Sequence, residues 1–279
     1  MKNYINAALF SFAILSLLTL FSCEEIAPTI PPLGPKETGD RKVIVEEFTG
    51  VKCVNCPNGS AQLENLIAGV YGENLIVVSI HAGEYSDPYS DSRYDFRTPE
   101  GTYLLGYFGE PLGYPTAVIN RQVFPPSTQF QNSQSAQWTN HIKSVLDVAP
   151  SLSLNIENVL DGTSRNLTVK STIVPTEDIN GEVRLTVMLT ETNILDKQLT
   201  PTGLNIDYSH KHVLRKVLTN FDGNAITETL RAGVPIEKSY AFTLPEAWNI
   251  ENCKIVAFVH RATATDKHIL QAEEKSLTE

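Results

Sequence analysis

The two cysteines Cys53 and Cys56 constrain this chain more than any other sequence feature. An apolar run at 43–48 ends just before them and an amphipathic segment begins just after them, so both thiols are expected at the first turn of a helix. The free N–H groups and the dipole at a helix start favour a thiolate, which is the reactive form of cysteine. With two residues between them, the second thiol can attack a mixed disulfide formed at the first, so the pair predicts a redox centre.

Two other interpretations of the pair remain open. A Cys-x-x-Cys pair can supply half of a structural zinc site, but neither a second cysteine pair nor a nearby histidine pair follows it. The pair can also form a disulfide that only stabilises the fold. The sequence therefore predicts no metal, and it leaves a catalytic and a structural disulfide as alternatives.

The first residues indicate export. Lys2 precedes an apolar stretch at 7–21 that is short for a transmembrane helix and typical of a secretory signal. The stretch ends in Ser22-Cys23, which resembles the lipobox of bacterial lipoproteins. This resemblance implies that residues 1–22 are removed and that lipid on Cys23 holds the protein on a membrane. Residues 23–40 are then a lipidated, Pro-rich tether. A plain signal peptide or an uncleaved anchor is the alternative.

The charge balance disfavours one class of partner. The 279 residues carry a formal net charge of −10 and no visible basic patch, so nucleic acid is not expected as a partner. No phosphate loop, nucleotide fingerprint or serine nucleophile motif appears, and no cofactor is expected.

The two halves of the chain have different patterns, and the length suggests two domains. Residues 41–149 alternate strand-length apolar runs with amphipathic segments, which predicts an α/β domain. Residues 150–279 contain short β-branched segments between turn residues, which predicts an all-β immunoglobulin-like sandwich. In the first half we expect strands at 43–48, 75–80 and 116–119 and helices at 58–70, 100–108 and 131–148. In the second half we expect strands at 152–156, 167–174, 183–189, 212–218, 239–244, 255–260 and 269–272.

Two further residues accompany the cysteine pair. Glu47 lies six positions before Cys53, and Pro115 directly precedes another predicted strand. Thioredoxin-like folds place a buried acid and a cis-proline at these positions, so residues 41–149 resemble a thioredoxin-like domain. The resemblance implies that Cys53 attacks a substrate disulfide and that Cys56 resolves the mixed disulfide. It also implies that Glu47 assists proton transfer and that Pro115 orients the substrate. Substrate contacts are then expected beside this proline, at Tyr114 and Thr116.

The similarity to thioredoxin is incomplete. Thioredoxin carries Gly-Pro between its cysteines, whereas this chain has Val54 and Asn55. The charge of Lys52 is expected to favour a thiolate at Cys53. Residues 84–113 form an insertion rich in aromatic side chains, which either lines a substrate groove or packs as a lid on the core.

Several short motifs are similar to those of one narrower family. They are Glu46-Glu47-Phe48-Thr49-Gly50, Cys53-Val-Asn-Cys56-Pro57, Gly113-Tyr114-Pro115-Thr116, Asn120-Arg121 and His210-Lys-His212-Val-Leu-Arg215. They resemble the Bacteroidota outer-membrane lipoproteins named for a 28-kilodalton outer membrane protein, over nearly all of the mature chain. This resemblance implies a lipid-anchored protein of the cell envelope, at the outer membrane of a Gram-negative bacterium. It brings no settled activity.

Three other candidate sites each have two interpretations. His210 and His212 would share one face of a strand, where with Glu191 they could begin a metal site, but histidines without a metal are the default. His81 either relays protons near the disulfide or is a hydrogen-bonded histidine at a strand edge. Cys253 either exchanges with the pair or is a small buried residue at a strand start.

The sequence therefore supports two hypotheses about function. The first is a membrane-anchored oxidoreductase that exchanges thiols and disulfides with extracytoplasmic proteins or peptides. The second is a surface binding or structural lipoprotein in which Cys53–Cys56 is only a structural disulfide.

Overall fold

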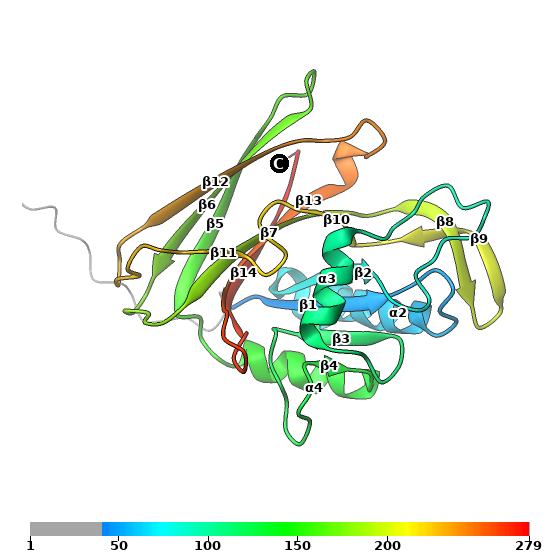
Figure 1. Ribbon diagram of the computed structural model, residues 1–279, viewed down its shortest axis with the longest axis horizontal. Helices are drawn as coiled ribbons and strands as arrows, with labels where there is room; N and C mark the ends of the chain where they lie inside the picture. Colours follow the sequence, from blue (N-terminus) through cyan, green and yellow to red (C-terminus); the bar gives the residue numbers. More distant parts are fainter. Residues whose placement is uncertain (1–40, 279) are drawn as a thin grey trace, which may run out of the picture. The chain divides into compact units, whose positions relative to one another are not determined.

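The computed structural model describes residues 41–278, which lie within one compact unit (Figure 1). The predicted signal segment, Cys23 and the rest of the predicted tether lie outside the described residues. Most of the described chain is β-sheet, and every strand and helix predicted above is present. Among residues 41–278, no helix is long and apolar enough to cross a membrane.

The first part of the chain forms four strands and three α-helices. The strands are β1 (Val43–Thr49), β2 (Leu75–His81), β3 (Thr116–Ile119) and β4 (Gln131–Asn132). The helices are α2 (Cys56–Leu66), α3 (Pro99–Phe108) and α4 (Ser135–Leu146). A π-helical turn, η2 (Ile67–Tyr71), continues α2, and a 3-10 turn, η3 (Gly72–Asn74), follows it. The predicted helix at 131–148 begins later than expected because Gln131 and Asn132 pair with β3.

Helices cover both faces of this part of the sheet. Leu63 of α2 and Trp138 of α4 pack against Val43 and Val45 on one face. On the other face, α3 packs against a second apolar cluster that includes Phe48. Because both faces are covered, every residue of β1 is buried, including its two glutamates. Successive side chains of a strand point to opposite faces, so Glu46 and Glu47 lie on opposite sides of the sheet.

The second part of the chain extends the same sheet. Strands β7 (Val183–Glu191), β10 (Val213–Val217), β13 (Cys253–Arg261) and β14 (Ile269–Ser276) join the first four in the order β14-β13-β7-β10-β2-β1-β3-β4, and the short β11 (Asn224–Ala225) pairs with β7. At the junction β10 runs parallel to β2, and the Ser79 amide donates to the His212 carbonyl oxygen at 2.7 Å. The two predicted domains, divided at residues 149 and 150, therefore share one sheet.

A three-stranded sheet packs over the far part of this sheet. It contains β12 (Ile236–Thr243), β6 (Asn166–Pro175) and β5 (Leu152–Leu160), in that order. The largest apolar cluster, which includes Val169, Leu185 and Ile255, fills the space between the two sheets. A 3-10 turn, η4 (Ile250–Asn252), leads into β13.

A separate two-stranded hairpin was not predicted from the sequence. Its strands β8 (Ile194–Thr200) and β9 (Gly203–His210) pair only with each other, and the hairpin lies beside α2 (Figure 1). The Leu199 amide donates to the Val51 carbonyl oxygen at 2.8 Å, which ties the hairpin to the loop that carries the cysteines.

Candidate redox site

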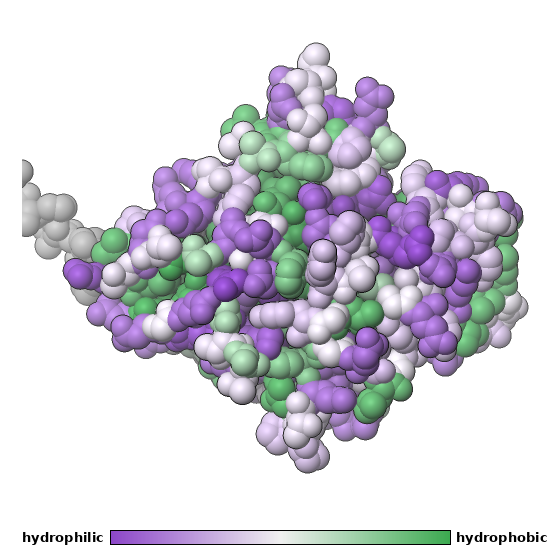
Figure 2. Space-filling model, in the orientation of Figure 1, coloured by the Kyte–Doolittle hydropathy of each residue, from purple (hydrophilic) through white to green (hydrophobic). Residues whose placement is uncertain are grey.

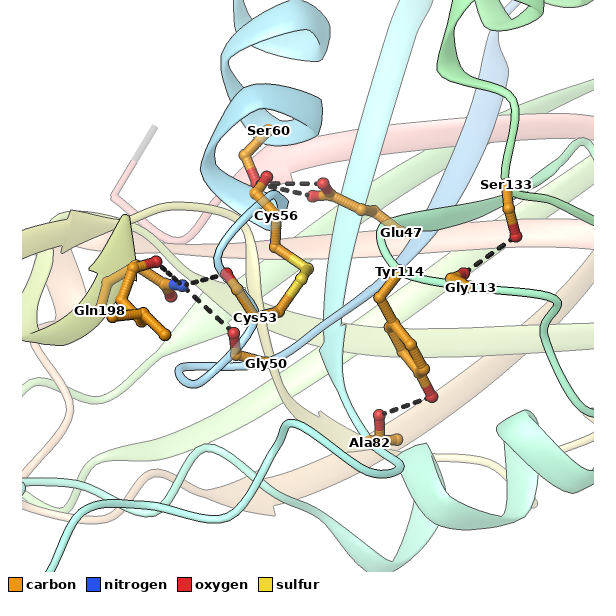
Figure 3. The surroundings of a disulfide bond; sticks show 11 residues. Glu47, Gly50, Cys53, Cys56, Ser60, Ala82, Gly113, Tyr114, Ser133 and Gln198 are labelled. Atoms are coloured by element: carbon orange, nitrogen blue, oxygen red, sulfur yellow. Dashed lines mark hydrogen bonds between the residues drawn. A yellow bond between two sulfur atoms is a disulfide. The ribbon is translucent and has the colours of Figure 1, made fainter. Parts of the chain in front are cut away.

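Cys53 and Cys56 form a disulfide between β1 and α2 (Figure 3). Their Cα atoms are 5.4 Å apart, and Cys56 is the first residue of α2. The two residues are only 3% and 1% exposed, whereas Val54 between them is 40% exposed. The pair therefore occupies the predicted place at the helix start, but in this oxidised state its surface is almost entirely covered.

The carboxyl group of Glu47 lies on the α2 face of the sheet, on the same side as the disulfide (Figure 3). It is fully buried and accepts hydrogen bonds from the hydroxyl groups of Ser60 at 3.0 Å and Ser79 at 3.1 Å. Burial raises the pKa of Glu47 to about 7, although these two bonds oppose the shift. The Ser60 hydroxyl also donates to the Cys56 carbonyl oxygen at 3.3 Å, so it contacts both the acid and the backbone of the second cysteine.

The two serines were not singled out from the sequence. Ser60 follows Cys56 by four residues, which puts both on one face of α2. Ser79 is a polar residue within an otherwise apolar strand, and it is the register partner of Glu47. The sequence signal that could have identified Ser79 is its hydroxyl group within an otherwise apolar run.

Pro115 follows a cis peptide bond to Tyr114. Its ring lies against α2, where a Cβ atom on Gly59 would stand only 2.7 Å from the proline Cγ atom. The Tyr114 hydroxyl donates to the Ala82 carbonyl oxygen at 3.1 Å (Figure 3). Thr116 begins β3 and is fully buried, so of the two predicted substrate contacts only Tyr114 reaches the surface groove described next.

A surface groove of about 430 Å³ runs beside the disulfide. Cys53 lines it and Cys56 does not. Apolar side chains form much of its rim, and Leu112 is 84% exposed there. The other lining residues are Lys52, Val54, Asn55, Glu84, Tyr85, Pro111, Gly113, Tyr114 and Leu199.

The aromatic insertion divides between this groove and the core. Tyr85 packs edge-on against Tyr114 at the groove, with ring centroids 5.5 Å apart. Phe96 is buried in a small cluster with Val51 and Val213. Some aromatic residues of the insertion therefore line the groove and others pack in the core. Each of the two interpretations describes part of the segment.

The hairpin covers the cysteine loop. Gln198 of β8 donates through its side-chain amide to the carbonyl oxygens of Cys53 at 3.1 Å and Gly50 at 3.2 Å (Figure 3). Apolar residues of the hairpin remain on the outside, at the end of the molecule that β8 and β9 occupy (Figure 2). They are Leu195, Leu204 and Ile206.

The two histidines considered as metal ligands have separate roles. Strand β9 ends at His210, whereas His212 has a φ of 53° and is bonded to Glu64 Oε1 at 2.6 Å. Glu191 instead pairs with Arg215 at 3.4 Å and accepts a bond from the Asn249 amide. Among residues 41–278, no group of three or more metal-ligating side chains comes together.

Cys253 is a free thiol in the core. It is 1% exposed, and burial raises its pKa to about 12. Its strand β13 is separated from β1 by three other strands of the sheet, a distance of about 19 Å at the usual strand spacing. A protonated, buried thiol at this distance is a small core residue and not a partner of the disulfide.

Two of the motif residues form a buried ion pair on the opposite face of the sheet. Arg121 donates to Glu46 through Nε at 2.8 Å and through Nη2 at 2.7 Å, and neither side chain is exposed. The guanidinium also lies 4.6 Å from the ring centroid of Phe258 in β13. This pair joins β1 to the turn after β3 and to the far part of the sheet.

These features define a largely β-sheet protein with a small helical region and a Cys-x-x-Cys disulfide at a helix start. The family model "Outer membrane protein Omp28" matches residues 107–279, and the chain belongs to this family. The protein is accordingly an outer membrane protein, as the sequence predicts. The matched span includes Pro115 and the segment from His210 to Arg215, but not Cys53 or Cys56.

Solved structures are similar in fold. HBP35 of Porphyromonas gingivalis is 22% identical over 86% of this chain and 76% of its own, with a TM-score of 0.69. A domain of the outer membrane lipoprotein Omp28 from Porphyromonas gingivalis is 14% identical over 46% of this chain and 88% of its own, with a TM-score of 0.32. The comparison with curated proteins gave no match.

Proposed function

We propose that this outer membrane protein exchanges thiols and disulfides with extracytoplasmic proteins or peptides. The observation that carries the proposal is the position of the disulfide between a buried acid and an open groove. On one side Glu47 has a pKa of about 7, which suits a group that must both accept and release a proton near neutral pH. On the other side Cys53 and Tyr114 line a groove with an apolar rim.

The topology supports a thioredoxin-like assignment for the first part of the chain. Its elements follow the order β1-α2-β2-α3-β3-β4-α4, and its strands lie in the order β2-β1-β3-β4. Strand β1 is parallel to β2 and antiparallel to β3, and the cis-proline directly precedes β3. The packing of β5, β6 and β12 over the far part of the large sheet supports an immunoglobulin-like sandwich for the second part.

The groove suggests how the two cysteines divide the reaction. Since Cys53 lines the groove and Cys56 does not, Cys53 forms the mixed disulfide and Cys56 resolves it. Glu47 accepts the Cys56 proton, and the Ser60 hydroxyl holds the Glu47 carboxyl group in place. Pro115 and Tyr114 orient an extended substrate in the groove, while buried Thr116 keeps this backbone in place.

One observation favours the second hypothesis. Both cysteines are nearly fully buried and the hairpin covers their loop, as expected for a disulfide that only stabilises the fold. The reduction potential of the purified protein separates the two proposals. A value between about −120 and −270 mV is expected for an exchange protein, and a value below about −300 mV would mark a structural disulfide.

Trapping then tests the roles of the two cysteines. In the Cys56→Ser variant, a mixed disulfide at Cys53 has no resolving thiol, so substrate-linked species should accumulate and be released by a reductant. The Cys53→Ser variant is the matched control and should trap far less. Equal trapping by both variants would contradict the assigned roles.

The membrane anchor is the last part of the proposal. Family membership and the lipobox-like Ser22-Cys23 support lipid attachment at Cys23, with residues 24–40 as the tether. The Cys23→Ala variant should lose the lipid in mass spectra of the mature protein and leave the membrane fraction. Retention of this variant in the outer membrane would exclude Cys23 as the anchor.

A further inference from the structure

A second cavity lies on the face of the sheet that α2 covers. Its volume is about 310 Å³, and it is bounded by α2, strands β1 and β2, and strand β9 of the hairpin with the residues that follow it. Glu47 lines this cavity, whereas the surface groove is lined by a different set of residues that includes Cys53. The buried acid therefore faces a space of its own.

His81 is the unusual residue of this cavity. It is 3% exposed, and among residues 41–278 neither of its ring nitrogens has a hydrogen-bond partner. Its ring packs near Phe96 and His210, with centroids 4.9 Å and 5.6 Å away. Buried polar groups without partners are rare and unfavourable, so the two nitrogens point to hydrogen-bonding molecules that occupy the cavity.

The cavity is suited to water. A water molecule occupies about 30 Å³ in the liquid, so the volume is ample for several. Polar atoms converge on it from three sides, with Ser60 on α2, Ser79 on β2 and Tyr208 on β9. Glu47 and His81 lie on the same face of the sheet in neighbouring rows, because Glu47 pairs with Ser79 and Thr49 pairs with His81.

We propose that this cavity is a water-filled chamber through which Glu47 exchanges protons with solvent, and that His81 is a positioning residue that holds the chamber water. The proposal rests on the proposed thiol–disulfide exchange and adds a separate proton route to it. A substrate in the groove closes the front of the disulfide. The chamber is lined by different residues from the groove, so the proton does not have to pass the bound substrate.

The step that uses this route balances without any further reactant. The Cys56 thiol gives its proton to Glu47, and the Cys56 sulfur attacks the Cys53 sulfur of the mixed disulfide. The bond between Cys53 and the substrate breaks, and the substrate sulfur leaves as a thiolate that takes a proton from solvent. Glu47 then releases its proton to the chamber water, which returns it to solvent.

Burial keeps three of the titratable groups around the chamber neutral, while Lys211 and His212 line it beside Glu64. Burial lowers the pKa of His210 to about 4 and that of His81 well below its usual value, so both rings are neutral. Burial raises the pKa of Tyr208, so its hydroxyl is neutral as well. On α2, Glu64 faces the chamber as a carboxylate, because bonds from His212 and Lys211 lower its pKa to about 2.

Two variants should remove water from the chamber, one by removing hydrogen-bonding groups and the other by occupying the space. His81→Phe removes the two nitrogens that hold water and keeps an aromatic ring of similar size. Ala61→Trp places an indole at the wall, where Ala61 is exposed on α2 and tolerates a larger side chain. Their controls are His141→Phe on α4 and Ala68→Trp in η2, which do not line the chamber.

The readout is the pKa of Glu47, measured by carboxyl carbon NMR titration with Glu47→Gln to assign the signal. Loss of water disfavours the charged carboxylate, so both chamber variants should raise this pKa by about one unit, and the controls should match wild type. The second readout is the release of an aromatic thiol from its mixed disulfide with Cys53. Below the Glu47 pKa, release should slow about tenfold in the chamber variants and reach the wild-type rate at high pH.

The outcomes separate the chamber from the proposed function. An unchanged Glu47 pKa in both folded chamber variants, or equal shifts in the controls, would overturn the chamber. If the chamber variants shift the pKa but wild-type protein does not release the thiol at any pH, the chamber is supported and the proposed exchange function fails.

Discussion

Gly59 lies directly against Pro115: a Cβ atom on the glycine would stand 2.7 Å from the proline Cγ atom. The same atom would stand 3.2 Å from Glu47 Oε1. The glycine thus lets helix α2, the cis-proline and the buried acid approach one another. Gly59 carries no reactive group, and it contributes to the site because it has no side chain that would hold these groups apart.

Gly59→Ala should therefore destabilise the protein by about 1–3 kcal/mol, because the added methyl group meets a rigid proline ring in a packed region. Gly69→Ala in η2 is the matched control, since nothing lies within 4 Å of that position. This second change should be neutral or stabilise by up to about 1 kcal/mol. Denaturant unfolding measures both, and similar effects at the two glycines would contradict the contact.

Glu47 should make stability depend on pH. Its folded pKa of about 7 lies above the ordinary value of 4.5, so the folded state binds more protons between these two pH values. Stability contributed by this group is present in full below about pH 4.5 and falls as pH rises through 7, by about 3 kcal/mol in all. Unfolding of wild type and Glu47→Gln across this range checks the sign, and a parallel pH dependence in both would refute it.

The ion pair between Glu46 and Arg121 should behave as one unit. Arg121→Met alone leaves a buried carboxylate without its partner and should cost about 3–5 kcal/mol. Adding Glu46→Leu removes that charge, and the double variant should recover most of the loss. A double-mutant cycle by denaturant unfolding measures the coupling, and simple additivity would show that the pair does not act together.

The hairpin should limit access to the disulfide through Gln198. Gln198→Leu removes the donor to the Cys53 and Gly50 carbonyl oxygens and should ease opening of the cysteine loop. Reduction by a small thiol should then be about thirtyfold faster, as expected from losing two hydrogen bonds worth about 1 kcal/mol each. Asn205→Leu, at the exposed register partner on β9, is the control and should leave the rate unchanged.

Much of the fold follows from local patterns. The apolar runs at β1 and β2 and the helical spacing in α4 predict these elements because each pattern reports on the faces of its own segment. The hairpin β8–β9 was not predicted because most of β9 is exposed and the strand lacks a buried face. The connection Pro201-Thr202 between alternating segments was the signal that could have revealed it.

The candidate site was predictable in part for a similar reason. Cys53, Cys56, Glu47 and Pro115 were found because they occupy fixed offsets from a strand or a helix start. Gln198 lies 145 residues from Cys53, and no local offset connects them. The role of His81 depends equally on a cavity whose walls come from α2, β2 and β9.

The sequence by itself determined most of the elements, the place of the cysteine pair at a helix start, and the outer-membrane family of this protein. Spacing and periodicity carry this information because they act within one segment or its neighbours. Only the tertiary structure decided that β10 pairs with β2 to join both parts in one sheet, and that the hairpin covers the disulfide. These contacts join segments more than 100 residues apart, and their partners are selected by the packing of the whole core.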